Sequence, residues 1–187
     1  MISADIVAFA MVAVMQTVLA VVWLVGARAA GDQRAAAHHW TAFAVFSAVG
    51  FMLLILSRQA GIGSHPEVLR AAGNIVGVVA FIALRRGVAQ FVGRPASTAW
   101  DVVLLSLVLG ASVIGLFPEG GRTRVAVISA ALGVYIIAIA AALHEHARDR
   151  LHFRQPWLLA VPLLCASAGF WYRATNAVAS TAAVSNE

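Results

Sequence analysis

Long apolar runs recur along the whole chain, and each is about as long as a helix that crosses a lipid bilayer. Crossing about 30 Å of hydrocarbon takes about 20 helical residues, and helices satisfy their own backbone polar groups there. The sequence is 61% hydrophobic and 11% charged, whereas about 25% of residues are charged in a typical soluble domain. The runs therefore predict an all-α integral membrane protein.

Six such runs are separated by short joints that contain glycine, proline or charged residues. We expect these runs to form one transmembrane domain over residues 1–187, a bundle of about six helices. The predicted spans are about 5–27, 40–57, 68–92, 99–117, 122–143 and 157–179.

The distribution of arginine predicts the orientation in the membrane. The first, third and fifth joints hold eight arginines, and the second and fourth joints hold four. Positive charge concentrates on the cytoplasmic side, so we expect the N-terminus and the end of the sixth span outside. Arg173 interrupts that last span and a small, polar tail follows. We expect that the polypeptide continues beyond Glu187, with a tail that binds back onto the domain as the alternative. Because the arginines mark span ends, we expect no nucleic-acid partner despite a pI near 11.0.

Four short motifs occur in an order and spacing that resemble one family. They are W-T-A-F-A from Trp40, L-L-I-L-S-R ending at Arg58, G-N-I-V-G around Asn74, and A-L-R-R-G-V-A-Q-F-V-G-R-P at 83–95. This pattern resembles the N-terminal multi-span sensory region of membrane-anchored bacterial diguanylate cyclases, the GGDEF proteins. Phe43 stands where the family pattern has glycine, and the chain contains no GGDEF motif.

The resemblance implies a location and a role. We expect a multi-pass protein of the bacterial inner membrane that controls cyclic di-GMP synthesis by a cytoplasmic output domain beyond residue 187. We also expect a homodimer, because such a cyclase must pair two active sites. The alternatives from other classes are a small transporter or channel, and a haem-binding membrane protein.

A polar cluster surrounds the joint between the second and third runs, on the expected outer side. The hypothesis is a shallow pocket in which arginine forks bind a carboxylate or phosphate. In the alternative interpretation the arginines contact lipid headgroups, or Arg58 pairs with Glu67 to hold the turn. The predicted ligand-binding residues are Arg58, Arg70, Asn74 and Arg173.

Histidines at the expected cytoplasmic ends could ligate haem iron or zinc. The candidates are His38, His39, His144 and His146. Neighbouring histidines point to different helix faces, so the sequence favours a polar cap over a metal site, and we expect no cofactor.

Catalytic patterns are absent from the sequence, so we expect no enzymatic activity in this chain. Asp5, Asp101 and Glu119 all lie near predicted span ends, which argues against a proton relay through the bilayer centre. Gly73-x-x-x-Gly77 and Ser129-x-x-x-Gly133 predict close helix approach. We expect that approach within one chain, with dimerisation as the alternative.

Overall fold

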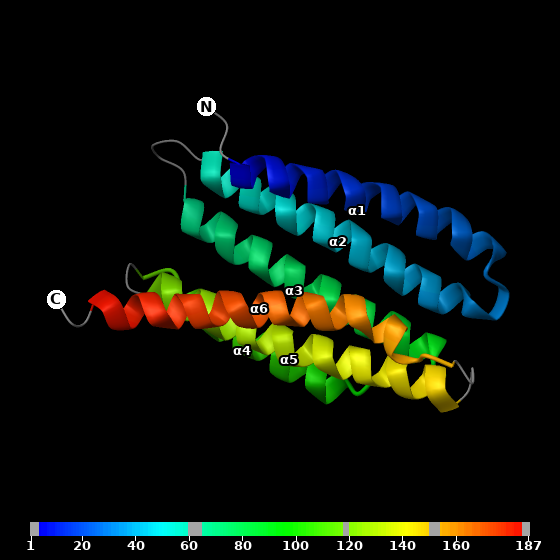
Figure 1. The fold of residues 1–187 in the computed structure, drawn as a ribbon. Coiled ribbons are helices and arrows are strands. Elements are labelled where there is room, and N and C mark those ends of the chain that lie inside the picture. The colour runs from blue at the N-terminus through cyan, green and yellow to red at the C-terminus, as the bar shows by residue number, and fades with distance from the viewer. Residues whose placement is uncertain (1–3, 60–64, 118–119, 150–153, 185–187) are drawn as a thin grey trace. The chain divides into compact units, whose positions relative to one another are not determined.

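The computed structural model describes residues 4–59, 65–117, 120–149 and 154–184, and these residues are almost entirely helical (Figure 1). The prediction of an all-α protein is therefore confirmed. The helices are α1 (Ala4–Ala29), α2 (Arg34–Gln59), α3 (Pro66–Phe91), α4 (Thr98–Ile114), α5 (Gly120–Asp149) and α6 (Trp157–Val184), with a short 3₁₀ helix, η1 (Gly31–Gln33), before α2.

Five of these helices are long and apolar enough to cross a membrane, and α4 is the exception. It has 17 residues, which is about 25 Å of helix at 1.5 Å per residue. The structure therefore supports a helical membrane protein, while the predicted span over 99–117 is a shorter helix.

The helices form two compact units, residues 1–91 and residues 92–187. In unit 1, α2 lies in the middle and packs against both α1 and α3. In unit 2, α5 lies in the middle and packs against α4 and α6. Short joints make consecutive helices antiparallel within each unit, as Figure 1 shows.

Small residues hold the helices of unit 1 close together. A Cβ added at Gly50 of α2 would lie 3.2 Å from the carbonyl oxygen of Gly73 and 3.4 Å from the nitrogen of Gly77 on α3. The glycine motif of α3 therefore packs within the chain, as expected. At the other end of the unit, the ring of Trp40 lies against Gly87, and its centroid is 4.7 Å from that of Trp23.

In unit 2, a small residue likewise allows close contact between α5 and α6. Gly133 on α5 leaves room for the indole of Trp171, because an added Cβ would come within 2.8 Å of its Nε1. The hydroxyl of Ser167 donates a hydrogen bond of 3.0 Å to the carbonyl of Gly133. Ile136 and Ile139 on α5 are fully buried. The second predicted site of close approach is therefore also used inside the chain.

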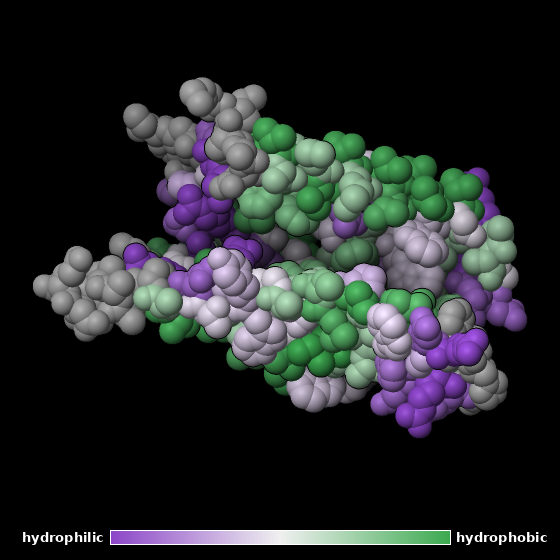
Figure 2. All heavy atoms as spheres, in the orientation of Figure 1, coloured by the Kyte–Doolittle hydropathy of each residue, from purple (hydrophilic) through white to green (hydrophobic). Residues whose placement is uncertain are grey.

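Large apolar side chains cover the outside of the helices. On α1 they include Met11, Val14 and Val18, all more than half exposed. Figure 2 shows this apolar surface over the middle of α1, with hydrophilic residues toward the helix ends. A water-soluble protein rarely exposes so much contiguous apolar surface, so these side chains are expected to face lipid.

We expect Gly73→Val to loosen the contact between α2 and α3. A Cβ at this position would lie 3.1 Å from the carbonyl oxygen of Gly50 and 3.2 Å from the side chain of Leu54. Overpacking of this kind costs about 1–3 kcal/mol, which thermal unfolding in lipid nanodiscs would measure. Gly77→Val is the matched control, because a Cβ there meets nothing within 4 Å. Equal losses for both variants would contradict the proposed close contact.

Candidate functional site

Two arginines lie at one end of unit 1, on helices that pack against each other. Arg58 is in the last turn of α2, and Arg70 is in the second turn of α3. The guanidinium carbon of Arg58 lies 5.4 Å from the centre of the Phe9 ring on α1, within the range of a cation–π interaction. The ends of all three helices of unit 1 thus contribute to this polar end.

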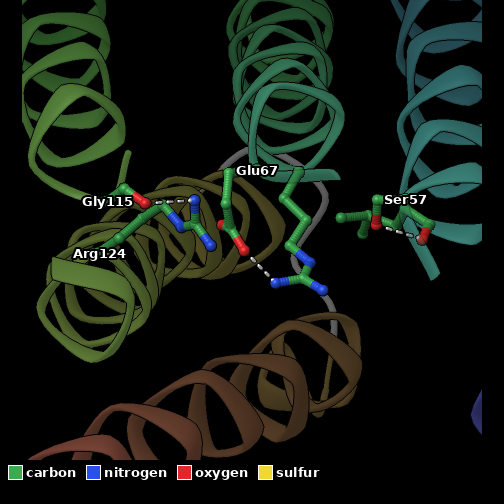
Figure 3. A network of polar contacts seen from close by, with 6 residues as sticks. Ser57, Glu67, Gly115 and Arg124 are labelled. Carbon is green, nitrogen blue, oxygen red and sulfur yellow. Dashed lines mark hydrogen bonds and ion pairs between the residues drawn. The ribbon is translucent and has the colours of Figure 1, made fainter. Parts of the chain in front are cut away.

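Arg70 is held by an acid on its own helix. Its Nη1 donates to Oε1 of Glu67, three residues earlier, and the two side chains are 40% and 39% exposed. Figure 3 shows the pair beside the start of α3. Asn74 lies one turn further along α3 and is half-buried. An exposed ion pair is worth about 0–1 kcal/mol, so a competing anion can replace Glu67 at small cost.

The predicted ligand residues are divided between the two units. Arg58, Arg70 and Asn74 belong to unit 1, where antiparallel packing brings them to one end. Arg173 is an exposed residue of α6 in unit 2. Its part in a shared pocket therefore stays a prediction.

The predicted histidines are likewise divided. His38 and His39 lie in the second turn of α2, and His144 and His146 lie near the end of α5. Among the residues that the structure describes, no group of three or more histidine, cysteine, aspartate or glutamate side chains could hold a metal ion. The haem hypothesis stays a prediction.

A carboxyl group is buried inside unit 2 and bonded to a tyrosine. The hydroxyl of Tyr135 on α5 donates a hydrogen bond of 2.6 Å to Oδ1 of Asp101 on α4. Each residue is only 5% exposed. Both therefore lie inside the protein, at the contact between α4 and α5.

Tyr135 lies near the middle of the long apolar stretch of α5, which carries no charged residue between Arg124 and His144. Asp101 contacts it from the first turn of α4.

Asp101 is in the first turn of α4, near the end of its helix as expected. Its position relative to a membrane stays a prediction.

Arginine contacts join α5 to the chain at both ends of α4. Nη1 of Arg124, which is 4% exposed, donates to the carbonyl oxygen of Gly115 just beyond α4, at 3.2 Å (Figure 3). A cation suits the carbonyl end of a helix, so Arg124 does more than contact headgroups. On the other side, Arg94 pairs with Glu145 of α5 at 2.6 Å.

Comparison of the chain with family models, curated proteins and solved structures gives no match. The resemblance to GGDEF sensory regions therefore stays a prediction, which rests on four short motifs. The described residues offer two polar sites, one at the end of unit 1 and one inside unit 2.

We expect Tyr135→Phe to destabilise unit 2, because it removes the hydroxyl that the buried Asp101 accepts from. Losing this buried hydrogen bond costs about 1–3 kcal/mol, which thermal unfolding in nanodiscs would measure. Tyr172→Phe removes the same hydroxyl from a residue that is 70% exposed, and should leave stability unchanged. If both variants unfold like the wild type, the hydrogen bond does not stabilise unit 2.

Proposed function

We propose that this chain is a membrane sensory module that binds a small anionic ligand on the outer side of a bacterial inner membrane. It controls a cytoplasmic diguanylate cyclase domain located beyond residue 187, and it works as a homodimer. In this proposal the N-terminus lies outside and six helices anchor the module.

The observation that supports the proposal is the polar end of unit 1. Two guanidinium groups, those of Arg58 and Arg70, lie on the adjacent ends of packed helices α2 and α3. Guanidinium groups bind carboxylate and phosphate through two parallel hydrogen bonds, and the amide of Asn74 lies one turn below. A small anion between the two helices would complete this site.

Glu67 acts in this proposal as an internal competitor for the ligand. Its carboxylate occupies Arg70 when no ligand is present, and an incoming anion displaces it. The ligand then bridges α2 and α3, which are in close contact near Gly50 and Gly73. A ligand shifts the equilibrium between two packings only by its difference in affinity for them.

We expect some anion from a panel of phosphate, sulfate, acetate and citrate to raise the unfolding temperature of the protein in lipid nanodiscs. Arg70→Ala should abolish the gain, since it removes a proposed ligand group. Arg122→Ala is the matched control, because Arg122 is an exposed arginine at the start of α5 and should retain the gain.

Glu67→Gln should bind the same anion up to about fivefold more tightly, because it removes a competitor worth about 0–1 kcal/mol. The signalling proposal is tested in the full-length protein, where cyclic di-GMP output should respond to the anion and lose that response in Arg70→Ala. The proposal is wrong if no anion changes stability and the arginine variants signal normally.

A further inference from the structure

The net positive charge of unit 1 lies at the end where α1 passes into α2. The charged residues of this basic end are Arg28, Asp32, Arg34, Arg85 and Arg86. Four arginines and one aspartate give it a formal charge of +3, whereas the two arginines of the other end are balanced by Asp5 and Glu67. Clustered arginines beside membrane helices attract anionic lipids. We propose that the basic end binds the headgroup phosphate of an anionic phospholipid, whose acyl chain lies along α1.

Contacts between the three helices of unit 1 bring the basic end together. The ring centroids of Trp23 on α1 and Trp40 on α2 are 4.7 Å apart, and those of Trp40 and Phe91 on α3 are 5.7 Å apart. Arg86 on α3 is close enough to His39 on α2 to interact with it electrostatically. The end of α1, the start of α2 and the end of α3 therefore meet here.

Two tryptophans indicate the level of a lipid headgroup independently of the charge. Trp23 is 36% exposed, and Trp40 beside it is half-buried. Tryptophan is enriched at the interface between membrane and water, where its ring lies among the headgroups. Trp23 precedes Arg28 by five residues, or about 7.5 Å of helix. The aromatic and the basic residues therefore indicate nearly the same level.

An exposed apolar stripe on α1 leads to Arg28. It is formed by Val14, Val18, Val21 and Val25, all more than half exposed. These residues are three or four apart, so they share one helix face, and the exposed Arg28 continues that face three residues later. The stripe and Arg28 extend over about 21 Å, and one leaflet of hydrocarbon is about 15 Å thick. A lipid whose acyl chain covers the stripe can therefore reach Arg28 with its phosphate.

Arg34 supplies the second guanidinium group of the proposed site. It is the first residue of α2 and is exposed, and only residues 30–33 separate it from the end of α1. Guanidinium groups bind phosphate through paired hydrogen bonds. A soluble anion would contact the arginines alone, and a second copy in the same orientation would bring like charges together. A phospholipid matches both the charge of the arginines and the apolar stripe.

The test is native mass spectrometry of the protein released from nanodiscs that contain phosphatidylglycerol and phosphatidylcholine in equal amounts, with identical acyl chains. The wild type should retain phosphatidylglycerol in preference. The double variant Arg28→Gln, Arg34→Gln should lower this preference by about fivefold for each charge removed. Arg122→Gln is the matched control, because it removes an exposed arginine from unit 2, and it should keep the preference. Arg28→Lys with Arg34→Lys should also keep most of it.

Further conditions distinguish a lipid from other occupants of the basic end. Inorganic phosphate at constant ionic strength should not displace phosphatidylglycerol, and a short-chain phosphatidylglycerol should be retained far less. The inference is overturned if the glutamine variant retains phosphatidylglycerol like the wild type, if inorganic phosphate displaces the lipid, or if the protein is released as a dimer without it. Arg70→Ala should leave lipid retention unaltered, so a failure of the sensory proposal would not affect this one.

Discussion

Hydrocarbon offers no hydrogen-bond partners, and the structure follows from that constraint. The backbone of the described residues is satisfied almost throughout by helices. Polar side chains at depth bond within the protein: Thr17 donates to the carbonyl of Ala13, Ser167 to that of Gly133, and Tyr135 to Asp101. The hydroxyls of Thr17 and Ser167 both donate to backbone carbonyl oxygens, so neither is left without a hydrogen bond inside the helices. The third places a carboxyl group inside unit 2, at the contact between α4 and α5.

Close packing in both units depends on small residues because lipid tails are as apolar as the helices themselves. Without a hydrophobic driving force between helices, van der Waals contact must hold them together. Gly50 and Gly73 permit it in unit 1, and Gly133 permits it in unit 2. Since these glycines serve contacts inside the chain, a homodimer would need another surface, and the exposed apolar faces of the helices provide one.

The proposed anion would act at the polar end of unit 1, where Glu67 occupies Arg70. It would replace a group already bonded within the chain, so its binding would act on the packing of two neighbouring helices, α2 and α3.

The amino-acid sequence alone determined the helical membrane class and the approximate positions of six helices, because apolar length and joint chemistry are local properties. It also indicated that Gly73 and Gly133 lie at helix contacts. Tertiary structure decided what the sequence could not. That Asp101 meets Tyr135 and that Arg124 is buried against Gly115 both depend on the register between helices. Register is set by side-chain packing between distant segments, and no local pattern encodes it.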